Sequence, residues 1–334
     1  MRCEAMDTNG VALEADRPAR LGWLFGLIAV GALVAGVVHF GDIERFATLA
    51  RGAEPLWLCA AIVLQCATYC AVAFGWSLVL GRAHHPVRLR RLLPVALSKL
   101  FADQVIPSAG IGGNVLLVDR LAALGAPRGA AVATLLVSLL GYYSAYAALA
   151  FVMLLALWFH GAATALMTGL VTTFLLVALA IPALALWLHH RGSRPLPDRI
   201  ERLAIVRTLL RAVGEAPESL VRDRRLILRV AACNGAVFVA DAATLAVCLF
   251  ALGQPVSLST AFIALMTASI VTTLGPIPMG LGSFEASCTA MLVMLRVPLE
   301  AAVAATLLLR SLTLWLPLVP GLYLMRAGMT RSGA

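Results

Sequence analysis

Long apolar runs, separated by short charged segments, dominate the pattern of this chain. Runs of roughly 20 apolar residues are long enough to cross a bilayer as helices. The runs are continuous rather than alternating, which favours helices over the strands of a barrel. We therefore predict an all-α, polytopic integral membrane protein with six membrane-spanning helices, at Gly22–Phe40, Pro55–Leu80, Gly129–Phe159, Ala162–Leu188, Val230–Leu252 and Pro298–Met325.

Two further apolar segments are interrupted in the middle by clusters of helix breakers. Inside a helix a proline costs about 3 kcal/mol and a glycine about 1 kcal/mol, so such a cluster ends a helix rather than bending it. Each segment is therefore predicted to form two half-helices joined by a turn, a re-entrant hairpin that enters and leaves the membrane on one side. The hairpins are predicted at 92–117 and 260–295, with breaks at Pro107 and Gly110 and at Gly275, Pro276 and Pro278.

The two halves of the chain resemble each other at a fixed separation. Ile106-Pro107 and Ile277-Pro278 lie 171 residues apart, and so do Pro127-Arg-Gly-Ala-Ala-Val-Ala133 and Pro298-Leu-Glu-Ala-Ala-Val-Ala304. The same separation places the second span on the fifth and the third on the sixth. Because the second and fifth spans run in opposite directions, we predict an inverted-topology repeat, in which paired broken helices indicate a binding site near the membrane midplane.

This repeat divides the chain into consecutive parts. We predict a cytoplasmic tail at 1–21, an extra first helix at 22–40, repeat one at 55–158, a connecting helix at 162–188, a basic cytoplasmic segment at 189–229 and repeat two at 226–329.

Composition and charge agree with the membrane assignment and add an orientation. Of the 334 residues 61% are apolar and 13% are charged, against about 25% charged in a soluble domain. Of the 26 basic residues, 21 lie in the tail, in 82–91, 120–128 and 189–229, and after residue 325. Since cytoplasmic loops are enriched in Lys and Arg, we predict a bacterial inner-membrane protein with both termini in the cytoplasm. No nucleic-acid partner is expected, because these arginines are not interleaved with stacking aromatics.

Five ionisable residues fall at membrane depth, where a charge is costly and usually functional. Arg310 lies about 18 Å into the last span at 1.5 Å per residue, so it needs a carboxylate or an anionic ligand. Glu285, just after the second break, is its natural partner. Two interpretations stay open: the pair only locks the hairpin to the last span, or Arg310 binds a phosphate with the help of the hairpin.

The other three membrane residues are Lys99, Asp103 and Asp241. Lys99 and Asp103 are four residues apart and share a helix face, which favours a self-neutralised pair over a functional one. Asp241 has no obvious local partner. A hydrogen-bonded structural role is favoured for it, and proton coupling is the alternative.

The starts of the second half-helices offer backbone N–H groups that attract anions. Ser283 is predicted to be an N-cap with Glu285 in the first turn, and Asn114 is predicted to cap the corresponding half-helix of the first hairpin. The sequence has no HExxH motif, no P-loop lysine and no His/Cys metal spacing. We therefore predict no catalytic residue, metal or cofactor.

These motifs together resemble the lysylphosphatidylglycerol synthase transmembrane family. The resemblance covers roughly 55–325 and implies a lipid-handling membrane domain. In full-length relatives such a domain flips an aminoacylated phospholipid made by a cytoplasmic synthase domain, and stand-alone members have proposed roles in moving glycolipid, polyprenyl-phosphate or hopanoid-type lipids. The residues that carry it are Gly275-Pro-Ile-Pro-Met-Gly-Leu-Gly-Ser-Phe-Glu285, Val297-Pro-Leu-Glu-Ala-Ala302, Leu309-Arg-Ser-Leu-Thr-Leu-Trp-Leu-Pro317, Gly321 and, in the first repeat, Pro107-Ser-Ala-Gly-Ile-Gly-Gly113.

The chain also departs from the pattern of that family. The family usually has an acidic residue after the paired glycines of the first hairpin and an Arg three residues further on, where this chain has Asn114 and Leu117. Where repeat two has Arg310, repeat one has Ser138. The first repeat has thus lost polar groups, which implies either a less charged substrate or an asymmetric site.

Three functions are weighed against one another. The leading hypothesis is a translocator of an anionic or phosphate-bearing lipid. The second is an accessory protein that docks a lipid-modifying enzyme, and the third, disfavoured because the 189–229 segment is too short for a synthase domain, is an integral lipid transferase. The headgroup is predicted to bind at Arg310, Glu285, Asn114, Ser108, Gly112, Gly113, Gly280, Gly282 and Ser283.

Overall fold

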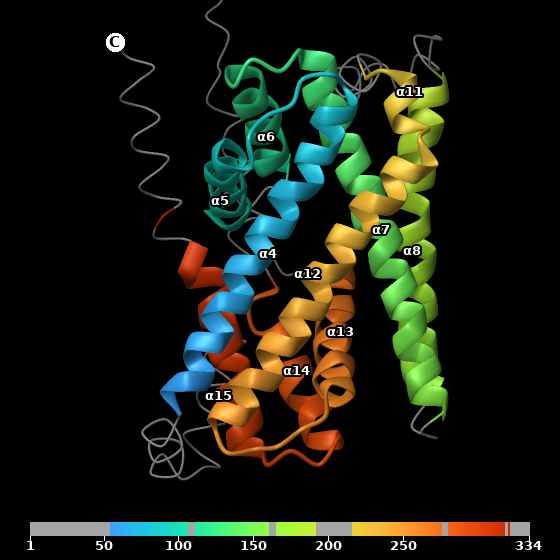
Figure 1. Ribbon diagram of the computed structural model, residues 1–334. Coiled ribbons are helices and arrows are strands. Elements are labelled where there is room, and N and C mark those ends of the chain that lie inside the picture. The colour runs from blue at the N-terminus through green and yellow to red at the C-terminus, as the bar shows by residue number, and fades with distance from the viewer. Residues whose placement is uncertain are drawn as a thin grey trace, which may run out of the picture.

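The structure is a computed structural model that describes residues 54–105, 111–159, 165–191, 216–275, 280–317 and 320. Within these residues it is built from helices, without a strand (Figure 1). The helices are α4 (Pro55–Arg82), α5 (Leu89–Val105), α6 (Ile111–Ala123), α7 (Arg128–Phe159), α8 (Ala165–Arg191), α11 (Glu218–Val221), α12 (Arg224–Ala251), α13 (Leu258–Leu274), α14 (Ser283–Met294) and α15 (Leu299–Arg310), which a π-helical turn, Ser311–Trp315, continues.

Four of the described helices are long and apolar enough to cross a membrane. These stretches are Pro55–Arg82, Arg128–Trp158, Met167–Leu184 and Arg224–Ala251. They confirm four of the six predicted spans. The first predicted span, Gly22–Phe40, lies outside the described residues.

The last predicted span differs from a single long α-helix. Its described part is α15, of 12 residues, then the π-helical turn and the α-helical residues Leu316, Pro317 and Pro320. In a π-helical turn each residue bonds to the fifth along, so one extra residue is accommodated without breaking the helix. This π-helical turn begins directly after Arg310.

Each interrupted segment forms two helices that pack on each other. Helix α5 contacts α6, and α13 contacts α14. In Figure 1 the first pair lies at the upper end of the bundle and the second at the lower end. Gly275 follows α13 as its C-cap, and its N–H bonds to the carbonyl of Val271 at 2.9 Å. The predicted breaks at Pro107, Gly110, Pro276 and Pro278 and the neighbouring Ser108 lie outside the described residues.

The helices fall into two sets with matching order and length. Helices α4 and α12 have 28 residues each, α5 and α13 have 17 each, and α6 and α14 have 13 and 12. The contacts also correspond, because α4 packs on α5 and α7 as α12 packs on α13 and α15. Helices α4 and α12 lie side by side across the middle of the molecule (Figure 1).

The bundle exposes apolar side chains and turns several polar ones inward. Leu176, Leu179 and Trp187 of α8 are exposed, while Gln65 of α4 and Thr244 of α12 are buried. In a membrane the lipid is as apolar as leucine, so small and polar residues hold helices together. One such residue, Gly141 of α7, lies so close to α12 that a Cβ would be 2.8 Å from Val230 Cγ1 and 3.0 Å from the Ala231 backbone nitrogen.

Helix α12 begins at Arg224, six residues before the predicted start of the fifth span. Asp223 is its N-cap, and the carboxylate accepts hydrogen bonds from the backbone N–H of Arg225 at 3.1 Å and of Leu226 at 3.2 Å. Arg82, at the end of α4, donates to the same carboxylate at 3.2 Å. Arg224 and Arg225, which are predicted from the sequence to lie in the cytoplasmic segment, therefore belong to the first turn of α12, and Asp223 caps that turn.

Candidate functional site

The second hairpin and the last helix meet in a buried ion pair. Arg310 Nε donates to Glu285 Oε1 at 2.8 Å, and the side chains are only 12% and 7% exposed. Arg310 ends α15, and Glu285 lies in the first turn of α14. The pair therefore joins two helices through side chains that are 25 residues apart in the sequence. A buried pair of this kind costs desolvation energy, so it is weak evidence for stability alone.

The second carboxylate oxygen of Glu285 binds the start of its own helix. Glu285 Oε2 accepts from the backbone N–H of Gly282 at 2.6 Å. Gly282 occupies the N-cap position with φ of 82°, and Gly280 has φ of 62°. Both values lie in the left-handed region that glycine adopts without a steric penalty. The glycines thus shape the turn that brings Glu285 to Arg310.

The predicted role of Ser283 as an N-cap is wrong. Helix α14 begins at Ser283, Gly282 is the cap, and Ser283 Oγ donates instead to the carbonyl of Gly280 at 3.2 Å. The neighbouring Phe284 has its ring 4.7 Å below the guanidinium carbon of Arg310. Arg310 therefore lies between a carboxylate and an aromatic face, which favours a cation at this point.

The π-helical turn after Arg310 contacts α4. Tyr69 of α4 donates from its hydroxyl to the carbonyl of Leu312 at 3.5 Å. One turn earlier in α4, Gln65 Nε2 donates to Asp241 Oδ1 at 2.8 Å and to Thr244 Oγ1 at 3.1 Å. Asp241 thus has a partner, 176 residues away in the sequence. Helix α4 carries both contacts on one face, because Gln65 and Tyr69 are four residues apart.

The first hairpin holds an ion pair of its own. Lys99 Nζ donates to Asp103 Oδ2 at 2.6 Å, as the spacing of the two residues predicts. The carboxylate lies against α6, since a Cβ on Gly113 would overlap it. Asp103 Oδ1 is buried without a hydrogen-bond partner among the described residues. Asn114 lies in the first turn of α6, which begins at Ile111, so the predicted N-cap role of Asn114 is wrong.

Counted from the start of each helix, Thr272 holds the same position in α13 as Asp103 in α5. Thr272 Oγ1 is likewise buried without a partner in the described part of the chain. Its side chain lies against Gly280, where a Cβ would overlap it. In both hairpins a polar side chain from the end of the first half-helix therefore packs on a glycine near the start of the second.

Several residues of the site have no signal in the sequence alone. Gln65 and Thr272 are uncharged residues inside apolar helices, and Phe284 follows a serine that seemed the better candidate. Their roles depend on inter-helix packing. At two positions where the resemblance to the family predicts polar groups, Leu117 is fully buried in the apolar core and Ser138 Oγ is buried without a partner in the described helices. The described residues contain no group of three potential metal ligands.

A comparison with known families matches nearly the whole chain. The sequence model of the lysylphosphatidylglycerol synthase TM region covers residues 23–321. This match extends through both hairpins, the Glu285–Arg310 pair and the four long apolar helices. A search of the curated proteins found no match to the chain.

Proposed function

Because the chain belongs to the lysylphosphatidylglycerol synthase transmembrane family, we propose that it is a translocator that moves an anionic, phosphate-bearing lipid between the two leaflets. The observation that carries the proposal is the buried contact of Arg310 with Glu285 at the start of a broken hairpin. A charge at membrane depth is costly, and by default it is a hypothesis for a functional site such as a substrate path.

The chemistry of the pair suits a phosphate. A guanidinium forms charge-assisted hydrogen bonds to carboxylates and to phosphates alike. An arriving phosphate can therefore replace Glu285 at Arg310. Glu285 keeps the hydrogen bond from the Gly282 N–H, so it remains held at the helix start when Arg310 turns to the lipid.

The matched sets of helices support a mechanism for exposing this site to each leaflet in turn. In the proposed inverted repeat, α4 to α7 correspond to α12 to α15, and the hairpins enter from opposite sides of the membrane. Rocking of one repeat against the other about the α4–α12 contact then opens the site alternately. The hydrogen bond of Gln65 with Asp241 lies in this α4–α12 contact, and the hydrogen bond of Tyr69 with Leu312 joins α4 to the π-helical turn after α15.

The hairpins also offer polar atoms to a headgroup. Asp103 Oδ1 and Thr272 Oγ1 are buried without partners in the described residues. An unmet buried polar atom costs about 1–3 kcal/mol, so a ligand or water that bonds to it is favoured. We assign these two atoms to the lining of the headgroup path.

The test is lipid movement in liposomes that contain the purified protein. Fluorescent phosphatidylglycerol, phosphatidylcholine, a glycolipid and a polyprenyl phosphate are each placed in one leaflet, and the rate of their appearance in the other is measured. We expect acceleration of a phosphate-bearing anionic lipid and its loss in Arg310→Ala. Arg229→Gln, at an exposed position of α12, is the matched control and keeps the rate.

The comparison of lipid transport rates requires that the variants remain folded. The elution volume in size-exclusion chromatography and the unfolding temperature, both measured in detergent, test whether each variant is folded. No acceleration of any lipid by the folded wild-type protein, with and without a proton gradient, would overturn the proposal and favour the accessory function, which co-purification with a lipid-modifying enzyme would then test.

A further inference from the structure

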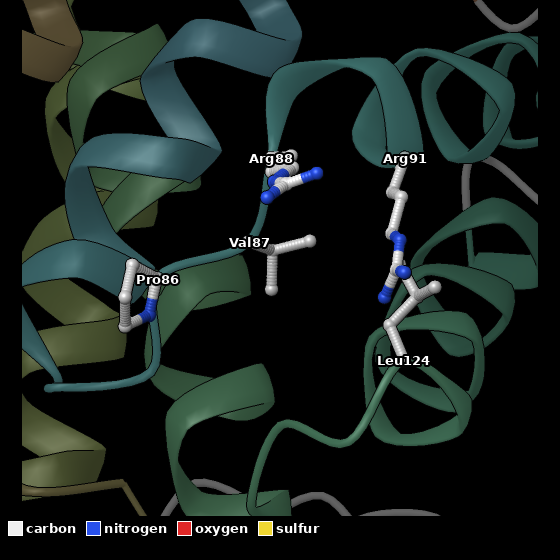
Figure 2. Close-up of a pocket in the computed structure, with 5 residues that line it drawn as sticks. All are labelled: Pro86, Val87, Arg88, Arg91 and Leu124. Carbon is white, nitrogen blue, oxygen red and sulfur yellow. The ribbon is translucent and has the colours of Figure 1, made fainter.

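A pocket with a volume of about 320 Å³ lies at the basic end of the bundle, away from Glu285 and Arg310. It is lined by Pro86, Val87, Arg88, Arg91 and Leu124. Figure 2 shows Val87 and Arg88 on one side of the space and Arg91 with Leu124 on the other. The volume is at the lower end of the range for small-ligand sites, about 300–1,000 Å³. The pocket therefore has room for a phosphate group.

The pocket is strongly positive for its size. Arg88 directly precedes α5 and Arg91 lies in its first turn, which contains no acidic residue. Neither guanidinium takes part in an ion pair within the part of the chain that the structure describes. Positive charge is unfavourable at the start of a helix, where the macrodipole is itself positive. An anion in the pocket would relieve this repulsion.

The position of the pocket indicates where such an anion comes from. It lies where α4 ends and the first hairpin begins, at the end of the bundle that also carries Arg82 and Arg222. By the distribution of basic residues this end faces the cytoplasm. The pocket lining combines the apolar side chains of Val87 and Leu124 with the two arginines. This combination suits the headgroup of a lipid whose acyl chains remain in the membrane.

We propose that this pocket is a second anion site, which binds the phosphate group of an anionic phospholipid from the cytoplasmic leaflet through Arg88 and Arg91. The site is independent of translocation, because binding here requires neither the Glu285–Arg310 pair nor any movement of the hairpins. A free phosphate carries the same chemistry and would bind to the same two guanidinium groups.

The test is equilibrium binding to the full chain in a zwitterionic detergent. The probes are short-chain phosphatidylglycerol, short-chain phosphatidylcholine and inorganic phosphate, and occupancy is read by native mass spectrometry. We expect Arg88→Gln/Arg91→Gln to weaken phosphatidylglycerol binding at least tenfold. Arg90→Gln, between them in the sequence but not in the pocket lining, removes one positive charge and should change the affinity less than twofold.

A second variant tests the cavity without changing charge. Val87→Phe fills the space between the arginines and should weaken binding as much as the double variant. If millimolar inorganic phosphate inhibits the binding of phosphatidylglycerol, the phosphate group alone is sufficient for binding to this site. If inorganic phosphate leaves the binding of phosphatidylglycerol unchanged, the rest of the lipid is required as well.

Three results would overturn the site. They are unchanged binding in the double variant, equal losses in Arg90→Gln, and phosphatidylcholine binding as tightly as phosphatidylglycerol. Translocation is measured separately, on Arg310→Ala. A negative result in the binding assay would therefore not refute the proposed translocator, and a negative result in the translocation assay would not refute this anion site.

Discussion

Among single residues, Glu285 has two partners and Arg310 faces both a carboxylate and a ring. Glu285 bonds to Arg310 and to the Gly282 N–H at once. Removing either charge breaks the ion pair and leaves the other charge in a buried place. Removing both leaves an apolar contact between α14 and α15. The effects on stability and on transport should therefore differ.

We predict that Glu285→Leu and Arg310→Leu each lower the free energy of unfolding by about 3–5 kcal/mol, the usual cost of breaking a buried pair. The double variant should recover most of that loss, because a well-packed apolar pair often equals a buried ion pair. It should nevertheless move no lipid. Reversible unfolding in mixed micelles and the liposome assay measure the two effects. A double variant that transports lipid would contradict a binding role for Arg310.

The sequence identified the charged members of this site but not their surroundings. Glu285 and Arg310 stand out because charge in an apolar run is rare. Gln65, Tyr69 and Thr272 do not stand out, since their roles arise only when helices far apart in the chain pack together. Ser283 shows the opposite error: it is a good capping residue, but the left-handed turn requires glycine at the cap.

Between elements, α7 approaches α12 closely at Gly141. We predict that Gly141→Ala costs about 1–3 kcal/mol, because the new methyl group meets Val230 and the α12 backbone, which cannot move cheaply. Gly169→Ala in α8 is the matched control, with nothing within 4 Å of the added carbon. It should gain up to about 1 kcal/mol from helix propensity. Equal effects of the two substitutions on the free energy of unfolding would contradict the close packing.

The start of α12 gives a pH-dependent prediction. The hydrogen bond from the Leu226 N–H, and then Arg82 and the Arg225 N–H, lower the pKa of Asp223 below its ordinary value. A carboxyl with a lowered pKa stabilises the fold fully above its unfolded pKa, about 3.9, and loses this effect as pH falls through the folded value. Asp223→Ala should therefore unfold at a lower temperature than wild type at pH 7.

That difference should shrink as the pH is lowered below about 4. Unfolding temperatures of both proteins from pH 7 to pH 3 measure it. Glu218→Ala, which removes an exposed carboxylate paired with Arg222, is the control and should show little difference at any pH, because exposed pairs contribute little. A constant difference between Asp223→Ala and wild type would contradict a role for the ionised carboxylate.

Helix positions were predictable to different degrees for physical reasons. Pro55 marks the start of α4 correctly, because proline suits the first turn of a helix. The start of α12 was missed, since Asp223 and the arginines after it look like a loop when only hydropathy is considered. The π-helical turn after Arg310 leaves no trace, because one inserted residue hardly changes an apolar pattern.

For the whole molecule, the proposed inverted repeat predicts on which side of the membrane each loop is exposed. Arg90 and Ser259 are exposed residues 169 apart, near the starts of the equivalent helices α5 and α13. In a variant lacking the native cysteines, Arg90→Cys should react with an impermeant maleimide only from the cytoplasmic side and Ser259→Cys only from the other. Labelling of intact cells and of inverted vesicles measures this. Reaction of both cysteines from one side would contradict the inversion.

The Glu285–Arg310 pair also determines how such a protein would respond to voltage. The two charges lie 2.8 Å apart and cancel, so the membrane potential does almost no work on the pair when a repeat rocks. An anionic headgroup that joins Arg310 and Glu285 leaves one net negative charge in the membrane, and each uncompensated charge gains or loses about 2.3 kcal/mol per 100 mV. With the cytoplasm negative, outward movement of an anionic lipid would be electrically downhill, and the potential itself would supply a direction.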